Sequence, residues 1–211
     1  MQDRQVSFNS VVRGIDINYQ FPIQEQACPD QLVGTLDQLR SDGAINLRAP
    51  SSTRQNQSAV ILVLESPHTS EFRHAIGPAQ GNTGRLIAKH ALTVAGIEGK
   101  DHAPLILINA IQYMCSLGQS PSLYRDEVFT AVWHEFGRSD FIARLKATYR
   151  DGDLVVCACT KGARDTSRNS LRKLVYTAIV EAIPQKALIL RRTHPSSWYS
   201  KKNRDFEWAI G

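Results

Sequence analysis

The first residues in this sequence that could do chemistry are Glu65, Ser66 and His68, which directly follow an apolar run. An acid, a hydroxyl and an imidazole at one point of the chain supply a general base and several hydrogen-bonding groups. The alternative is a polar turn that contains Pro67 and caps a helix.

Two further residues occupy the same kind of position, directly or shortly after an apolar run. Asn109 has a carboxamide that can donate and accept at the edge of a pyrimidine, although a terminal Asn also forms turns. His194 is a titratable imidazole suited to proton transfer or to stabilising an anion. The sequence therefore predicts three polar groups at the ends of three apolar segments.

A glycine-rich loop opens a helical segment and contains Gly81 and Asn82. Free backbone amides at the start of a helix can hold a phosphate or the edge of a base. The alternative is an ordinary connecting loop.

Positive charge surrounds His194 and is interleaved with hydroxyl and aromatic side chains. Cations neutralise phosphates while rings stack between bases, so this pattern is typical of a nucleic-acid contact. The alternative is a solvated basic turn with a buried tryptophan. The residues expected to contact nucleic acid are Arg191, Arg192, Ser196, Trp198, Lys201 and Lys202.

Short apolar runs and helical segments must position these side chains. The apolar runs are continuous, as in strands covered on both faces, and lie at 60–64, 105–108, 154–158 and 187–190. Segments with helical spacing lie at 84–94, 124–136, 141–149 and 170–183. This alternation predicts a three-layer αβα fold with a central four-stranded, mostly parallel sheet. Right-handed crossovers then bring the loops after the strands to one edge.

The chain length of 211 residues and the apolar content of 42% predict a single domain. We expect an α/β core over 59–211 and an N-terminal helical and loop extension over 1–58, packed on that core. Within the extension, 29–40 is predicted to be a helix that stops at Gly43, and 49–58 a surface loop.

Charge and hydropathy exclude some classes of protein. The net charge of +5 is modest and is by itself a weak argument for nucleic acid. No apolar stretch is long enough to span a bilayer, so we expect a cytoplasmic protein. We also expect it to be a monomer. The four cysteines lack the spacing of a zinc ribbon, a redox pair or an iron–sulfur site, and are expected to be buried free thiols.

In chain order, these segments resemble the motifs of the uracil-DNA glycosylase superfamily. Residues 64–68 resemble its first motif, in which a strand runs into a loop with Pro after the water-positioning residue. Residues 105–110 resemble the strand whose terminal Asn recognises the base, and 194–196 are similar to its HPS motif. In the following loop Trp198 occupies the place of the apolar residue that enters the duplex. The resemblance covers about two-thirds of the chain.

The sequence departs from that pattern at two positions. Ser66 stands where the best-known members have Asp or Asn, and a hydroxyl cannot carry the charge. A carboxylate from Glu65 or Glu71 requires a shift of register. In the superfamily an aromatic residue of this loop blocks the 5-position of the pyrimidine. Here His68 or a neighbour stands in its place. The resemblance therefore implies a pocket that admits a 5-substituted pyrimidine.

The implied activity is that of a monofunctional DNA N-glycosylase acting on double- or single-stranded DNA without a metal or organic cofactor. His194 would stabilise the departing base, and Glu65 with Ser66 would position water or stabilise the sugar cation. Asn109 would bind the base together with His68, Gly81 and Asn82; Asn82 and Ser196 would also hold phosphates.

Several alternatives remain open at this point. In one alternative the base is uracil or another deaminated base, and the protein acts in DNA repair. In the other the base is a bulky 5-modified cytosine, as found in some phage genomes, and the protein is a defence factor. A catalytically silent DNA-binding module is motivated by Ser66. A small-molecule α/β hydrolase using Glu65, His68 and His194 would show no salt-dependent DNA affinity.

Overall fold

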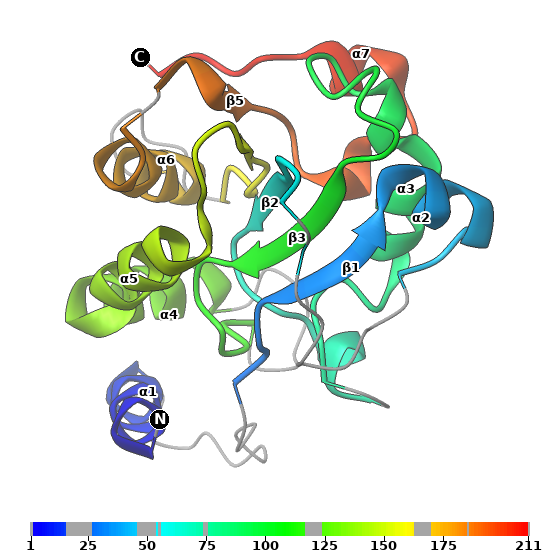
Figure 1. Ribbon diagram of the computed structural model, residues 1–211. Coiled ribbons are helices and arrows are strands. Elements are labelled where there is room, and N and C mark those ends of the chain that lie inside the picture. The colour runs from blue at the N-terminus through cyan, green and yellow to red at the C-terminus, as the bar shows by residue number, and fades with distance from the viewer. Residues whose placement is uncertain are drawn as a thin grey trace.

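One five-stranded sheet forms the centre of the protein, as the computed structural model in Figure 1 shows. The structure describes residues 2–15, 27–45, 54, 56–73, 76–116, 124–162, 170–184 and 186–210. The strands run in the order β1-β3-β2-β4-β5, and all neighbours are parallel except β1 and β3. Their bounds are Gln31–Thr35 (β1), Val60–Leu64 (β2), Pro104–Asn109 (β3), Leu154–Cys157 (β4) and Ile189–Arg191 (β5).

Three of the four apolar runs are confirmed as parallel strands, whereas the run at 187–190 is a strand only from Ile189, because its first two residues lie in a 3₁₀ turn. The predicted number of four strands is wrong, since the sheet has a fifth strand, β1. The predicted helix over 29–40 is wrong in its first half, which forms β1 on the edge of the sheet, while its second half is α2 (Leu36–Asp42). Leu32 and Val33 face opposite sides of the sheet, so their spacing only imitates one face of a helix. The stop at Gly43 is confirmed, since this residue caps α2 with a φ of 67°.

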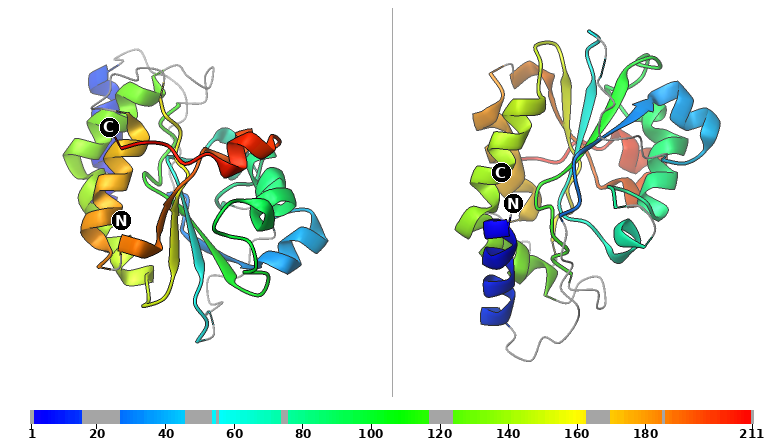
Figure 2. Two further views of the ribbon diagram at one scale, coloured as in Figure 1. Left: turned by 90° about the horizontal axis from the view of Figure 1, so that it is seen from above. Right: turned by 60° about the horizontal axis from the view of Figure 1, so that its bottom comes forward.

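Helices cover both faces of the sheet (Figure 2). One face carries α1 (Gln2–Ile15), α4 (Arg125–Val132), α5 (Arg138–Thr148) and α6 (Leu171–Ala182). The other carries α2, α3 (Asn82–His90) and α7 (Lys201–Asp205). A π-helical turn, Trp133–Gly137 (η3), joins α4 to α5, and short 3₁₀ turns occupy Thr69–Phe72 (η1), Ala91–Thr93 (η2), Lys186–Leu188 (η4) and Pro195–Ser197 (η5).

The core has two parts, one on each face of the sheet. Ile61 and Val63 of β2 pack under α4, α5 and α6, whereas Val60, Leu62 and Leu64 pack under α2 and α3. Because both faces are covered, the parallel strands are apolar along their whole length. Most of the predicted loop over 49–58 lies outside the described residues. None of the helices within the described residues is long and apolar enough to cross a membrane.

A buried carboxylate ties the segment before β2 to the start of β4. Asp153 accepts two bonds from Arg54 Nη1, at 2.8 and 2.7 Å, and further bonds from the backbone N–H groups of Ala59 and Arg150. Both charged side chains are almost fully buried. Removing the Asp153 carboxylate would therefore leave the Arg54 cation buried and uncompensated.

Asp153→Ala is expected to lower the free energy of unfolding by about 3 to 5 kcal/mol, because it strands Arg54 and two backbone donors. Urea unfolding measures this loss. The matched control is Asp151→Ala, since Asp151 is exposed and its replacement should change stability by less than about 0.5 kcal/mol. Equal stability of the two variants would contradict the structural role of the pair.

Candidate active site at the carboxyl edge of the sheet

Glu65 lies at the centre of the sheet edge where the parallel strands end. It follows β2, the middle strand, and its backbone C=O accepts from Ile111 N–H at 2.9 Å, so pairing with the β3 segment continues past both strands. The side chain is buried, and its Oε2 accepts the backbone N–H of Thr160 at 2.7 Å, in the segment after β4. The carboxylate is thus fixed between two strand ends.

The other residues of the first loop point to different places. Ser66 is half-buried and hydrogen bonds to the thiol of Cys115 rather than to Glu65. His68 is exposed, and its Nδ1 lies 3.1 Å from Thr69 Oγ1. No contact between His68 and Glu65 is recorded within the described part of the chain.

Asn109 ends β3 and is fully buried beside Glu71. Its Nδ2 donates to Glu71 Oε2 at 3.5 Å and to Cys28 Sγ at 3.5 Å, and the Cys28 thiol also donates to Glu71 at 3.9 Å. Burial raises the pKa of Glu71 to about 8, and the charge of Glu65 adds to this rise. Burial likewise raises the pKa of the Cys28 thiol, so at neutral pH it remains a donor.

The backbone at the end of β3 is held by a single guanidinium. Arg144 of α5 donates through Nη2 to the backbone oxygens of Asn109 and Ala110, both at 3.0 Å. Its other nitrogens bind Asp30, at 2.8 Å to each oxygen, and Asp140. Asn109 is therefore presented from a rigid strand end.

His194 begins the turn η5 after β5. The backbone N–H of Ser196 donates to His194 Nδ1 at 3.2 Å, and Ser196 Oγ lies 2.8 Å from the same atom. Because Nδ1 accepts from a backbone N–H, the proton of the neutral imidazole is on Nε2. Burial lowers the pKa of His194, Glu65 opposes this shift and Arg125 adds to it. The ring is therefore neutral at pH 7, and Nε2 is a hydrogen-bond donor.

The charge of Glu65 thus acts on both sides of this edge, on Glu71 near Asn109 and on His194. Among the sequence-predicted residues, Glu65 is thus coupled to His194 directly and to Asn109 through Glu71, which accepts from the Asn109 amide. Sequence reasoning missed Cys28 and Thr160. The spacing around Cys28 gives no signal of its role, because the following segment, β1, has the apolar spacing of a helix. Thr160 acts only through its backbone N–H, which no residue type reveals.

Two expectations for the basic segment are corrected by its contacts. Trp198, expected to be exposed, is 0% exposed in the core beside α3, and its indole N–H donates to Thr193 O at 2.9 Å. Arg192 is buried and donates to the backbone oxygens of Ala95 and Arg191, both at 2.9 Å. Neither side chain faces solvent, so neither can meet DNA in this conformation.

Arg191 also has intramolecular partners. It pairs with Glu207 at 2.5 Å and stacks over the rings of Tyr176 and Trp208. The exposed residues of this segment are Ser196, Tyr199, Lys201 and Lys202, of which Tyr199 is 72% exposed.

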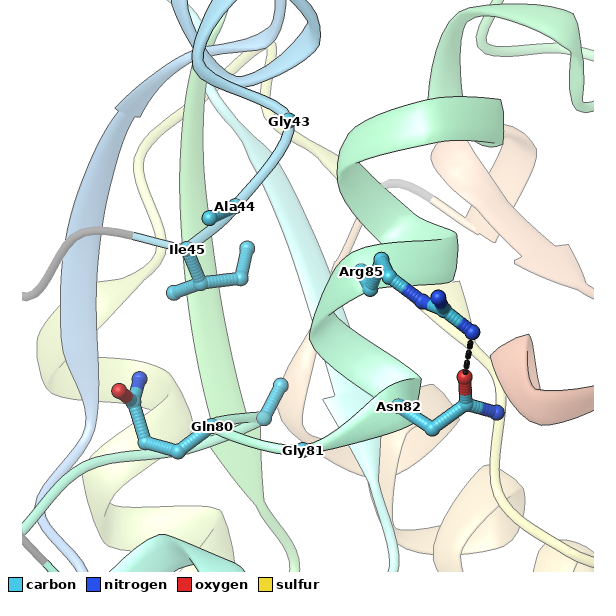
Figure 3. Close-up of a pocket in the computed structure, with 8 residues that line it drawn as sticks. Gly43, Ala44, Ile45, Gln80, Gly81, Asn82 and Arg85 are labelled. Atoms are coloured by element: carbon cyan, nitrogen blue, oxygen red, sulfur yellow. Dashed lines mark hydrogen bonds between the residues drawn. The ribbon is translucent and has the colours of Figure 1, made fainter.

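A pocket of about 540 Å³ lies between the end of α2 and the start of α3 (Figure 3). Ile45 faces it from one side, and the segment from Gln80 to Asn82 forms the other. Arg85 Nη2 donates to Asn82 Oδ1 at 2.8 Å, as the dashed line marks. The full lining is Gly43, Ala44, Ile45, Ala79, Gln80, Gly81, Asn82 and Arg85.

This pocket adjoins the Asn109 group through Ala79, whose backbone N–H also donates to the Glu71 carboxyl. Gly81 and Asn82, predicted from the glycine-rich loop, therefore line a pocket that is linked to Asn109 only through Ala79 and Glu71 in the described part of the chain. In the described ranges no group of three or more His, Cys, Asp or Glu side chains is placed to hold a metal ion.

The geometry at this edge combines a carboxylate, a carboxamide and a neutral imidazole, fixed by hydrogen bonds at the ends of β2, β3 and β5. Such a set can orient a ring with polar edges, stabilise an anion and position water. The chain matches no protein-family model, no curated protein and no solved structure.

Proposed function

We propose that this protein is a DNA N-glycosylase that removes a damaged or modified pyrimidine and leaves an abasic site. The observation that carries the proposal is the placement of Glu65, Asn109 and His194 after three parallel strands, where the charge of Glu65 acts on His194 and on Glu71, the partner of Asn109. The resemblance of the same three segments to the uracil-DNA glycosylase motifs supports this assignment and supplies the reaction. On this view the four parallel strands are the glycosylase-like core, and β1 is an addition to it.

In the proposed reaction the target nucleotide rotates out of the stack, at a cost of a few kcal/mol. Asn109 binds the polar edge of the base. Glu71 and Cys28 fix its carboxamide, and a fixed amide discriminates better than a mobile one. Because the carboxamide is buried, the loops around it must move apart before a base can reach it.

Breaking the glycosidic bond leaves negative charge on the base and positive charge on the sugar. His194 meets the first charge through its Nε2–H, which stays protonated while the ring is neutral. Glu65 meets the second, either directly or by orienting water for attack on the sugar. The bond from Thr160 N–H holds that carboxylate in place. None of these steps uses a cofactor.

The DNA contact is assigned to the exposed residues after β5. Lys201 and Lys202 would neutralise phosphates, and Ser196 would add a hydroxyl. Tyr199 replaces Trp198 as the aromatic available for the gap left by the flipped base, because its ring is exposed and directly follows the buried indole.

The Lys201→Ala/Lys202→Ala double variant is expected to bind DNA more weakly at low salt. The slope of log K against log salt should fall by about 2, since about 0.9 counterions are released per phosphate neutralised. Fluorescence anisotropy over a series of salt concentrations measures both effects.

The matched control is Lys146→Ala/Lys186→Ala. Both of these lysines are exposed and precede β4 and β5, at the opposite edge of the sheet. An equal loss of DNA affinity in the two double variants would show that Lys201 and Lys202 act only through the net charge of the protein, and not through a direct contact with phosphates.

The substrate is proposed to be uracil or a 5-substituted cytosine. The pocket at Gln80 to Asn82 favours the second. Its space of about 540 Å³ would take a substituent on the ring, and Ala79 lines it and also bonds Glu71, the partner of Asn109. Gln80, Asn82 and Arg85 would offer polar partners to a hydroxylated substituent.

The test is incubation with DNAs containing uracil, 5-methylcytosine, 5-hydroxymethylcytosine or glycosylated 5-hydroxymethylcytosine. Released bases are identified by mass, and abasic sites by alkaline cleavage. Release of one base supports the proposal. Salt-dependent binding without any release would indicate a silent DNA-binding module, and the absence of both would indicate a small-molecule enzyme.

A further inference from the structure

A guanidinium that the proposed reaction does not yet use, that of Arg125, lies among the loops that follow the strands. Arg125 is the first residue of α4, and its Nε donates to Asp126 Oδ1 at 2.9 Å. Asp126 lies against the segment after β4, since a Cβ on Gly162 would come within 2.8 Å of its Oδ2. In the same segment, the backbone N–H of Thr160 donates to Glu65. Arg125 is therefore connected to the loop that holds the Glu65 carboxylate.

The same guanidinium is close to the segments that follow β3 and β5. Burial raises the pKa of the Cys115 thiol and lowers that of His194, and Arg125 and Glu65 modify both values in opposite directions. Because such effects fade with distance, both charges lie near both groups. The Cys115 thiol is in turn bonded to Ser66 of the loop after β2. A cation and a carboxylate thus flank the same two side chains at this edge of the sheet.

Solvent reaches this cation only in part. The side chains of Arg125 and Asp126 are 17% and 19% exposed, whereas those of the ion pair Arg138 and Glu181 are 46% and 50% exposed. A partly buried charge is screened less than an exposed one. Asp126 binds only Nε, and among the described residues the two Nη groups of Arg125 have no recorded partner. These N–H groups are therefore available to an anion.

The backbone directly before Arg125 has an uncommon conformation. Tyr124 has a φ of 60°, a region that non-glycine residues rarely adopt. Its C=O accepts from Val128 N–H at 2.8 Å, which closes the first turn of α4. Residues in such regions cost about 1 to 3 kcal/mol and cluster at functional sites. The position of Arg125 at the start of the helix is thus maintained against a local strain.

We propose that Arg125 is a catalytic residue that binds the departing base as an anion and shares this task with His194. The inference rests on the proposed function for the identity of the anion. The glycosidic bond breaks with its electron pair on the base, a bond forms between the sugar and water, and the proton lost by water neutralises the base. An arginine keeps its own protons, so Arg125 acts by charge and hydrogen bonding alone. Glu65 then meets the sugar cation while Arg125 meets the base, which matches the direction of charge separation.

The test compares the binding of two free bases, uracil and 5-nitrouracil, by titration calorimetry at mildly alkaline pH. The nitro group acidifies the ring, so 5-nitrouracil is an anion under these conditions and uracil is neutral. The wild type should bind the anion about tenfold or more tightly than uracil, as expected for hydrogen bonds to a charged group. Arg125→Gln should lose this preference, and Arg125→Lys should restore part of it. A preference that is the same in Arg125→Gln and the wild type, or no binding of either base, would overturn the inference.

Two further variants separate anion binding from a role in the fold. Arg138→Gln is the matched control, because Arg138 is also the first residue of its helix and pairs with a carboxylate, that of Glu181 near the end of α6. It should keep the preference for the anion. Asp126→Asn breaks the same ion pair as Arg125→Gln but leaves the cation, so it should keep or increase the preference. An equal loss in Asp126→Asn and Arg125→Gln would show that the pair only holds the start of α4.

The titration of His194 checks the place of Arg125 independently. Burial lowers the pKa of His194, and of the two charged groups that face it Glu65 opposes this shift and Arg125 adds to it. Loss of the cation should therefore raise this pKa in Arg125→Gln, since a nearby positive charge disfavours the imidazolium. The ring ¹H signals of His194, followed by NMR over a pH series, measure the change. An unchanged pKa in Arg125→Gln would place the guanidinium away from His194 and contradict the inference.

Base release from DNA enters neither measurement, so the two proposals can fail separately. A protein that prefers the anion through Arg125 but releases no base from any DNA would overturn the proposed function and keep the anion site. A protein that releases a base while its preference for the anion does not depend on Arg125 would overturn this inference alone.

Discussion

Replacing His194 by alanine is expected to slow base release about 100- to 1,000-fold while DNA affinity changes little. The expected loss is that of one preorganised donor to a developing anion. The Nε2–H is available for this task because Ser196 occupies Nδ1 and because burial keeps the imidazole neutral at pH 7. Single-turnover kinetics on the DNA identified by the base panel would measure the rate, and binding to the abasic product would measure affinity.

The control for this prediction is His134→Ala. His134 is exposed on η3, between α4 and α5, and does not follow any strand of the sheet. Its rate should equal that of the wild type. Ser196→Ala should give a smaller loss than His194→Ala, because the imidazole remains while the hydroxyl partner of Nδ1 is gone. Full turnover by His194→Ala would remove the leaving-base role from this residue.

The strands could be predicted from sequence where the local pattern and the final environment agree. Residues 60–64 form one continuous apolar run, and both faces of β2 are indeed covered. For β1 the local pattern misled, because its pairing partner β3 lies about seventy residues away in the chain. Leu32 and Val33 fit a helix by spacing, yet they are extended because β1 pairs with the edge of β3 that no other strand occupies. Long-range pairing of this kind leaves no mark on a short window of sequence.

The same distinction applies to the candidate site. Glu65, Asn109 and His194 were found because each follows a strand, and parallel strands end at one edge. The intramolecular partners of the basic residues could not be predicted from the sequence. Glu207 neutralises Arg191, and the backbone oxygen of Ala95 holds Arg192, so two apparent DNA contacts are structural. Nor could spacing show that Glu71 meets Asn109, since η1 brings them together across 38 residues.

Glu65→Gln is the second prediction with a large expected effect, and it decides which residue of the first loop acts on the sugar. The substitution keeps an oxygen for the Thr160 N–H, so the fold at the end of β2 should be preserved. It removes the charge that would stabilise the sugar cation or take a proton from water. A fall of about 100- to 10,000-fold in the rate of base release is expected, with DNA affinity retained.

Ser66→Ala is the comparison variant that shows whether Glu65 or Ser66 is the acting group. The Ser66 hydroxyl is bonded to the Cys115 thiol, and its loss should change the rate by less than about tenfold if Glu65 is the acting group. The reverse outcome, a large loss in Ser66→Ala with Glu65→Gln nearly active, would move the role to the hydroxyl. A hydroxyl cannot stabilise a cation by charge, so that outcome would also require water positioning rather than electrostatics to drive the reaction. The sign of the difference between these two variants therefore separates two mechanisms as well as two residues.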